Sequence, residues 1–315
     1  MAIADAWVWH SLLQELDAWA VAGLEVTLWW RDDDASEPSR ALWRLRDVAE
    51  AVGGPVTLSV IPARVQPGLV SMVAGWPDVI PVQHGFTHIN HALGRNRQAE
   101  FVKTRPIGEM IADIQTGDRI MKDVFENRAL PVFVPPWNRM PGLLTKALAE
   151  LGFVGLSIHS PQDCRVDRRS LRALARTAVA MASAPFANGF NGHGQRLSGS
   201  GAKTILTIGA TIDVIDWRYH RFLGEYLVLD HVIDHLRRRR LGRINRAYPT
   251  GLLTHHAVMD ADAWRFIEHF VATTRIHPAV RWLTGKQVFG TGMECDQQGA
   301  LGFAPNHSWS DSLVA

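Results

Sequence analysis

Two histidines, His84 and His88, lie four residues apart in the segment His-Gly-Phe-Thr-His, directly after a strand-like run at residues 79–83. Neutral imidazoles bind zinc and its divalent neighbours, and a catalytic site of that kind commonly adds a carboxylate and keeps a position open for water. The chain offers such a carboxylate among Asp32, Asp33 and Asp34, which close an apolar run. The pattern therefore predicts a metal site, although a polar loop after a strand would give the same spacing in a chain with 14 histidines.

The elements that must position these side chains follow an alternating pattern. From residue 24 onward, short β-branched runs alternate with helical segments, as in βα units around a mainly parallel sheet or barrel. Because buried parallel strands are continuously apolar, as these runs are, eight candidates predict an α/β barrel. The candidate strands are residues 24–30, 55–61, 79–83, 130–134, 153–158, 177–182, 204–214 and 251–254. The candidate helices are residues 38–51, with Ser36 as N-cap, 107–126, 141–151, 224–240 and 260–274.

Polar clusters stand at or just beyond the carboxyl end of nearly every candidate strand. In α/β barrels that rim carries the active site. Their shared position strengthens the prediction of one site built from several strands. The clusters are residues 31–34, 84–91, 135–139, 213–218 and 255–256.

The composition predicts a soluble globular protein, and because single α/β barrels reach this length and no clear linker divides the chain, we expect one main domain. Of its 315 residues, 47% are hydrophobic and 20% are charged, which is enough for a large core. Residues 1–22 carry three acids and lack a basic start, so they predict an amphipathic helix rather than a signal peptide, and hence a cytoplasmic location. After that helix we expect a barrel at residues 23–290 and a loosely ordered tail at residues 291–315. A Gly-, Asn- and Ser-rich stretch at residues 187–201 is either a mobile lid or a plain loop.

Charge, cysteine count and hydropathy argue against several classes of protein. The formal net charge is +2, and the basic run at residues 237–240 ends a candidate helix, where cations complement the helix dipole. Since no aromatics interleave with this run, we expect no nucleic-acid partner. The chain has no stretch of about 18 apolar residues, so we expect no membrane span. The two cysteines, Cys164 and Cys295, lack motif spacing and predict no disulfide framework.

Taken in chain order, these residues resemble the polysaccharide deacetylase superfamily, the NodB-homology fold of carbohydrate esterase family four, over residues 25–256. The first motif of that family, a strand ending in Asp-Asp, is matched by Asp33-Asp34, with Asp32-Asp33 as a second register. The second motif, His-Ser/Thr-x-x-His, is matched by His84 and His88 with the hydroxyl residue displaced. The resemblance implies a single distorted (β/α) barrel of seven or eight strands.

The remaining motifs mark a divergent member. The third, Arg-x-Pro-x-Gly, is replaced by Val-Pro-Pro-Trp-Asn-Arg at residues 134–139, which keeps the proline and lacks the arginine and the glycine. Either Arg31 or Arg139 could replace that arginine. The fourth motif, Asp-x-x-Asp-Trp, is intact at residues 213–217, and the fifth, Leu-x-His, is intact at residues 253–255 and is followed by His256.

The resemblance implies a role for each matched residue. Asp34, His84 and His88 would hold one divalent metal ion, zinc first, with cobalt, nickel, iron or manganese as alternatives. The metal would activate a water and polarise the substrate carbonyl. Asp33 would be the catalytic base, and His255, oriented by Asp213, the catalytic acid. The residues expected to bind substrate are Trp137, Asn138, Arg139 and Trp217, although the two tryptophans would serve equally well as rim packing.

The implied reaction is hydrolysis of a C–N amide bond. The leading candidate is N-deacetylation of an amino sugar or saccharide precursor. A cytoplasmic enzyme would act on a small saccharide or amide rather than on a cell-wall polymer. The alternative within the superfamily is an amidase, deformylase or cyclic-imide hydrolase on a non-sugar substrate. A third reading is a carbohydrate-binding protein without activity, because fold does not imply function. The sequence leaves the oligomeric state open.

Overall fold

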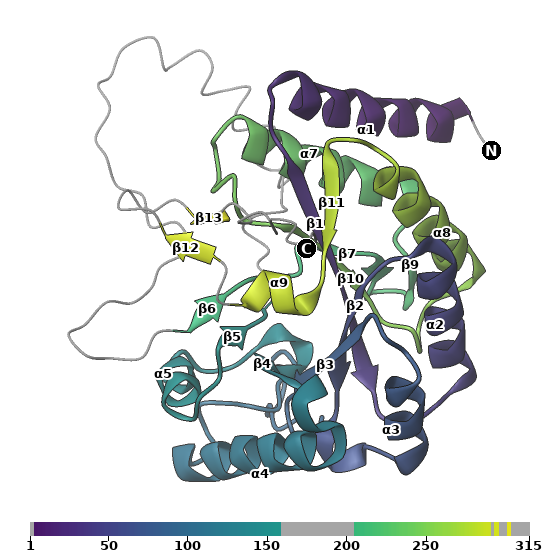
Figure 1. The fold of residues 1–315 in the computed structure, drawn as a ribbon. Helices are drawn as coiled ribbons and strands as arrows, with labels where there is room; N and C mark the ends of the chain where they lie inside the picture. Colours follow the sequence, from purple (N-terminus) through teal and green to yellow (C-terminus); the bar gives the residue numbers. More distant parts are fainter. Residues whose placement is uncertain (1–2, 159–204, 291–292, 296–300, 304–315) are drawn as a thin grey trace, which may run out of the picture.

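One parallel sheet builds the part of the chain that positions the polar clusters. The computed structural model describes residues 3–158, 205–290, 293–295 and 301–303 (Figure 1). Eight strands follow the order β6-β5-β4-β3-β2-β1-β10-β7, and β11 pairs with β1 beside that path. Because no ladder joins β6 to β7 among the described residues, the barrel is open there. This is the distorted (β/α) barrel of seven or eight strands that the sequence predicts. The strands are β1 (Val26–Ala35), β2 (Val56–Val60), β3 (Val79–His84), β4 (Leu130–Val134), β5 (Gly155–Leu156), β6 (Leu206–Thr207), β7 (Ile212–Asp213), β10 (Thr250–Thr254) and β11 (Val280–Leu283).

Helices cover the outside of this sheet, and the side chains of each strand divide between two apolar layers. Leu28 and Trp30 of β1 belong to the core under the helices, whereas Trp29 belongs to a separate core inside the barrel. This alternation is the period of two of a β-strand. It predicts that Arg31 and Asp33, further along β1, face the barrel interior. The helices are α2 (Arg40–Val52), α3 (Pro67–Ala74), α4 (Ile107–Phe125), α5 (Leu143–Glu150), α7 (Glu225–Arg240), α8 (Ala261–Arg275) and α9 (Gly285–Phe289).

The N-terminal helix α1 (Ile3–Val21) lies alongside α7 (Figure 1). Its buried side chains recur at helical spacing, which gives the helix one apolar face. Glu15 on that face is buried and binds Arg240 of α7 at 2.7 Å. The sequence predicts this helix, whereas the domain boundaries drawn around it stay a prediction. The buried apolar residues are Val8, Trp9, Leu12, Leu16 and Trp19.

Several element boundaries differ from the sequence-based expectation. β1 runs to Ala35 instead of ending at residue 30. The N-cap of α2 is Ser39, whose hydroxyl accepts a hydrogen bond from the amide of Leu42, so the assignment of Ser36 is wrong. In place of the predicted strand at residues 204–214 there are two short strands, β6 and β7, and the sequence pattern did not predict α3 or β11. The predicted strand at residues 177–182, the stretch at residues 187–201 and most of the tail lie outside the described residues.

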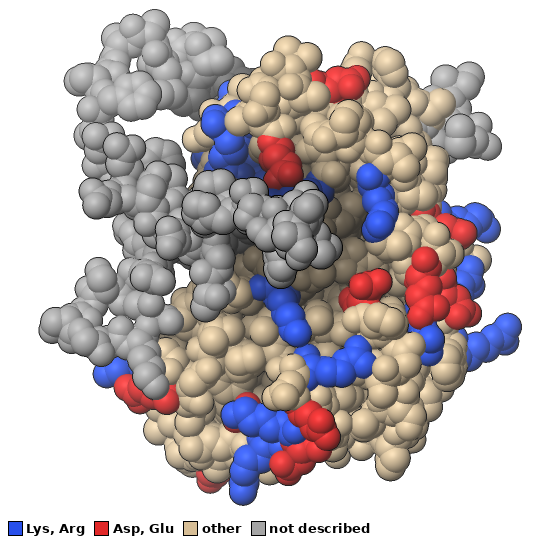
Figure 2. Space-filling model, viewed as in Figure 1, with Lys and Arg blue, Asp and Glu red and all other residues tan. Residues whose placement is uncertain are grey.

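The surface carries charges of both signs. On the face shown in Figure 2, Lys and Arg side chains are interspersed with Asp and Glu, in keeping with the formal net charge of +2. Among the described residues, no helix is long and apolar enough to cross a membrane.

Candidate metal and acid–base site

The acids of β1 stand inside the strand, not after it as the sequence suggested. Arg31, Asp32 and Asp33 are buried, and all three are part of the hydrogen-bonded strand. A register shift against β2 falls between Asp32 and Ala35, and Asp34 within it has a φ of 76°. Bulges of this kind re-aim a side chain. Here the shift brings the carboxylates of the consecutive residues Asp33 and Asp34 to one site.

Asp34 meets two histidines at the carboxyl edge of the sheet. Its Oδ1 lies 3.1 Å from Nε2 of His84 and 3.2 Å from Nε2 of His88. One ligand atom of each residue lies within 4.8 Å of the others, which is close enough for a single ion. Burial would raise the pKa of Asp34, but the two histidine rings within hydrogen-bond distance outweigh it and hold the pKa well below its usual value. The three side chains therefore form a site with an ionised carboxylate.

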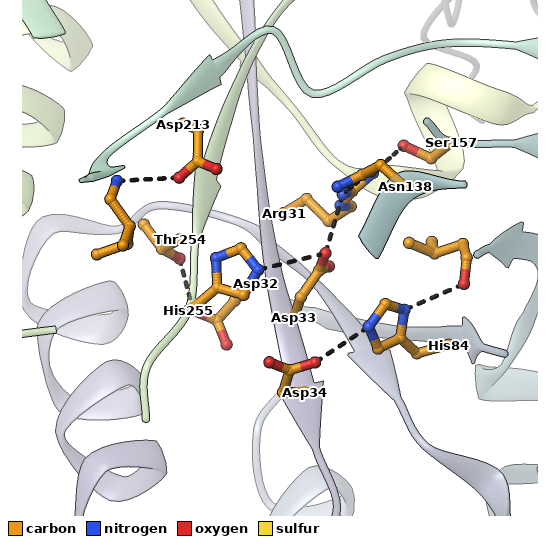
Figure 3. Close-up of polar contacts among 12 residues, drawn as sticks. Arg31, Asp32, Asp33, Asp34, His84, Asn138, Ser157, Asp213, Thr254 and His255 are labelled. Atoms are coloured by element: carbon orange, nitrogen blue, oxygen red, sulfur yellow. Dashed lines mark hydrogen bonds and ion pairs between the residues drawn. The ribbon is translucent and has the colours of Figure 1, made fainter. Parts of the chain in front are cut away.

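His84 is oriented by the backbone of the neighbouring strand. Its Nδ1 lies 3.0 Å from the carbonyl oxygen of Val134, and a carbonyl can only accept, so Nδ1 carries the proton (Figure 3). Nε2 then keeps its lone pair toward Oδ1 of Asp34. Two acceptors 3.1 Å apart need a positive charge between them, either a second proton or a metal ion. A backbone carbonyl on the distal ring nitrogen is also the usual outer partner of a metal-bound histidine.

The loop between the two histidines is held by a buried acid, Glu100. Its carboxylate accepts hydrogen bonds from the amide of Phe86 and from both the amide and the hydroxyl of Thr87. Gly85 has a φ of +57°, and a Cβ there would lie 2.1 Å from Oε2 of Glu100. Glycine is therefore the residue that lets the loop approach Glu100 this closely. Through this loop, Glu100 fixes the position of His88.

Asp33 is held by Arg31 from its own strand. The guanidinium of Arg31 donates to Oδ2 of Asp33 at 2.9 Å, to Oδ1 of Asn138 at 2.7 Å and to Oγ of Ser157 at 2.6 Å (Figure 3). Arg139, the other candidate from the sequence, donates instead to the carbonyl of Gln98. In this structure, Arg31 is the arginine that contacts Asp33.

Asp33 keeps one oxygen available. Its Oδ1 is buried and has no hydrogen-bond partner among the described residues. Burial would raise the pKa of Asp33, but Arg31, His84 and His255 outweigh it and hold the pKa below its usual value. An ionised carboxylate with one unpaired oxygen can accept a proton.

His255, the residue directly after β10, faces Asp33. Its Nε2 lies 3.9 Å from Oδ2 of Asp33. Asp213 was predicted to orient His255, but Nδ1 of His255 has no hydrogen-bond partner among the described residues. Asp213 instead accepts a hydrogen bond from the amide of Ile215 (Figure 3) and another from the indole nitrogen of Trp217. The Trp217 ring then packs edge-on against His255, with ring centroids 4.6 Å apart.

A second acid–histidine pair backs the site on the opposite face of β1. Asp32 accepts from the hydroxyl of Thr254 at 2.6 Å and contacts Nδ1 of His256 at 2.5 Å. Burial would lower the pKa of His256, but Asp32 outweighs it and raises the pKa. Asp33 and Asp34 therefore lie beside His84, His88 and His255, whereas Asp32 faces His256 on the other side of the strand. The geometry fits the Asp33-Asp34 register of the first motif and not the Asp32-Asp33 register.

The segment after β4 contributes the predicted substrate residues. Trp137 and Asn138 both have a φ of 55°, and the Trp137 ring lies 4.3 Å from the ring of His88. Non-glycine residues at positive φ cluster at functional sites. Four of the six in the described residues, including Asp34 and His88, lie here. Asn138 accepts from Arg31, so its amide oxygen is already engaged.

The sequence did not point to Glu100 or Ser157, nor to the pairing of Asp32 with His256 on the opposite face of β1. Gly85, which stands where the family has a hydroxyl residue, was the one local signal of a close approach. Nothing in the sequence indicated which acid makes that approach. Ser157 and Arg31 are 126 residues apart, so only the sheet brings them together.

No protein-family model matches this chain, and no curated protein matches it. Solved structures do match. A protein of Mycobacterium smegmatis assigned as a polysaccharide deacetylase shares 14% identity, with a TM-score of 0.51 over 84% of this chain and 88% of that one. A family 4 carbohydrate esterase from Streptomyces lividans, in complex with acetate, gives 14% and 0.47 over 90% and 98%. A family 4 acetyl xylan esterase from Clostridium thermocellum, in complex with a cobalt ion, gives 8% and 0.45 over 84% and 90%. At this identity, the Mycobacterium structure shows a shared fold, the NodB-like barrel that the sequence motifs implied.

Proposed function

We propose that this chain is a metal-dependent hydrolase that removes an acyl group from the nitrogen of an amino sugar or saccharide precursor. One observation carries the proposal. A possible metal site, Asp34 with His84 and His88, stands directly beside an ionised carboxylate, Asp33, that has one free oxygen. His255 faces the same carboxylate from the other side. A base and an acid flanking one metal site suit amide hydrolysis.

The residues at the site fit a divalent ion. Two imidazoles and one carboxylate are ligands for zinc, and they suit cobalt, nickel, iron and manganese as well. The lone pair of His84 directed at Asp34 leaves a place that a cation fills. When bound, such an ion would supply Lewis-acid polarisation of the amide carbonyl and a lowered pKa of water.

The protein's own groups divide the proton transfers between them. Asp33 takes the proton of the attacking water at Oδ1, while Arg31 holds Oδ2 and so fixes the direction of Oδ1. His255 delivers a proton from Nε2 to the departing nitrogen, because an amine is too poor a leaving group to depart as an anion. The Trp217 ring packed against His255 keeps the imidazole in place. The roles of Asp33 and His255 match those implied by the sequence motifs, with Asp213 acting through Trp217.

The substrate class rests on the motifs. Trp137 and Trp217 flank the site from two sides, and aromatic faces pack well on sugar rings. We propose a small saccharide as the substrate and a cytoplasmic location for the protein. A non-sugar amide, formamide or cyclic imide is the alternative, and a substrate panel separates the two.

The test measures metal content and hydrolysis on the same preparations. Protein purified without chelator is compared with His84→Ala and Asp33→Asn, against N-acetyl amino sugars and simple amides. We expect about one metal per chain in the wild type, loss of the metal in His84→Ala, and retention of the metal without turnover in Asp33→Asn. His277→Ala, at a mostly buried histidine that follows α8 and pairs with the exposed Asp17, serves as the matched control and should keep both. A wild type that binds no metal would overturn the proposal.

A further inference from the structure

We propose that the hairpin formed by β8 (Ile215–Asp216) and β9 (Arg221–Phe222) is a subsite for an anionic group of the substrate. This inference rests on the proposed function and names its substrate class: an acylated amino sugar that carries a carboxylate or a phosphate. The hairpin has a place at the site because its Trp217 ring lies against His255. A substrate whose nitrogen is next to His255 must therefore pass close to the hairpin.

The acids around the hairpin are already bound to its backbone and its indole. Asp213 accepts from Trp217 at 2.7 Å. Asp216 accepts from the amide of Arg218 at 3.0 Å, and Asp260 accepts from the amide of Phe222 at 3.0 Å. These bonds hold the hairpin in shape. Among the described residues, none of the three carboxylates forms an ion pair with Arg218 or Arg221, although Asp216 stands opposite Arg221 in the ladder.

The guanidinium groups of two hairpin arginines, Arg218 and Arg221, are therefore not paired with a carboxylate of the described residues. The guanidinium carbons of Arg218 and Arg221 lie 5.9 Å and 5.0 Å from the same ring, Tyr219. Both arginines are exposed, and neither has an ion pair within 4.0 Å in the described part of the chain. Two like charges held beside one ring repel each other, and an anion that contacts both would relieve that repulsion. Guanidinium groups recognise carboxylate and phosphate geometry in particular.

The exposed rings of the hairpin suit the rest of such a ligand. Trp217 and Tyr219 are 43% and 58% exposed, unusually open for aromatic side chains held in a folded hairpin. A sugar ring could pack on them while its acid group meets the arginines. The competing explanation is a solvated hairpin whose arginines merely stack on Tyr219. The two explanations predict different binding, because arginines that only stack on Tyr219 would give no preference for an anionic ligand.

Isothermal titration calorimetry on the zinc-loaded, full-length Asp33→Asn chain tests this without requiring turnover. The probes are N-acetylglucosamine, its 6-phosphate and N-acetylmuramic acid, which are neutral, phosphorylated and carboxylated. The variant Arg218→Gln with Arg221→Gln removes two charges from the hairpin. Arg119→Gln with Arg243→Gln removes two exposed charges elsewhere, on α4 and in the turn before β10.

We expect at least one anionic probe to bind about tenfold more tightly than the neutral sugar, as one charged hydrogen bond would give. That preference should vanish in the Arg218→Gln and Arg221→Gln double variant and persist in the control double variant. The anionic probe that wins tells phosphate from carboxylate. Equal binding of all three probes, no binding of any, or a preference unaffected by the hairpin variant overturns the inference. Because the readout is binding, a chain that prefers anions yet hydrolyses no amide in the wild type would refute the proposed function alone.

Discussion

Replacing Arg31 with glutamine should damage the site more than any other single change to its supporting residues. Arg31 is fully buried, and its guanidinium makes three hydrogen bonds, to Ser157, Asp33 and Asn138. The variant leaves the buried carboxylate of Asp33 without its cation. Removing one partner of a buried ion pair costs about 3–5 kcal/mol of unfolding free energy. We expect a loss in that range at neutral pH.

The pH dependence follows from the same contact. Burial raises the pKa of Asp33 and Arg31 lowers it, so the pKa of Asp33 should be higher in Arg31→Gln than in the wild type. In the wild type, a folded-state pKa below the unfolded one gives stability that is present above the unfolded pKa and lost as pH falls through the folded pKa. In the variant, protonation relieves the unpaired charge. The stability gap between the two proteins should therefore narrow as pH falls, and the acid limb of the pH–rate profile should move to higher pH.

Urea denaturation across the pH range measures the first effect, and kcat/KM on any substrate that the panel identifies measures the second. Arg139→Gln is the matched control, because the sequence left both arginines as candidates and Arg139 contacts only the carbonyl of Gln98. It should change the stability by less than about 1 kcal/mol. The reasoning is refuted if Arg139→Gln shifts the acid limb and Arg31→Gln leaves it unchanged.

Three further predictions concern the surroundings of the site. Glu100→Gln should weaken zinc binding about 10- to 100-fold, measured by calorimetry, whereas Glu109→Gln, at an exposed acid, should leave it unchanged; equal affinities would remove Glu100 from the site. Gly85→Ala should cost about 1–3 kcal/mol more than Gly94→Ala, because both positions have positive φ but only the first lacks room for a Cβ; equal losses in chemical denaturation would contradict the close approach. Burial, with Arg239 and Arg238, holds the pKa of His235 well below its usual value, so the free energy of unfolding of the wild type should decrease as pH drops below about 6.5. In His235→Gln this decrease should be smaller, and equal decreases in the two proteins would contradict the reasoning.

The sequence alone determined the barrel and most of the residues that meet at its rim. Apolar runs separated by helical segments are enough to predict parallel strands, because burial on both faces demands continuous apolar side chains. The spacing of His84 and His88, together with the run of three acids, pointed to a metal site because few residue types bind a divalent ion. These are local properties, readable from neighbours along the chain.

Only the tertiary structure decided which side chains contact one another at the site. The choice of Arg31 over Arg139 depends on the register that places Arg31 and Asp33 on the inner face of one strand. The assignment of Asp34 depends on a register shift and a positive φ that no propensity indicates. Asp213 proved to bind the amide of Ile215 and the indole of Trp217 rather than His255, a choice that the order of the motifs along the chain does not indicate. Glu100 reaches the histidine loop across a contact that exists only once the chain has folded, so its role could not be read from residue types or their spacing.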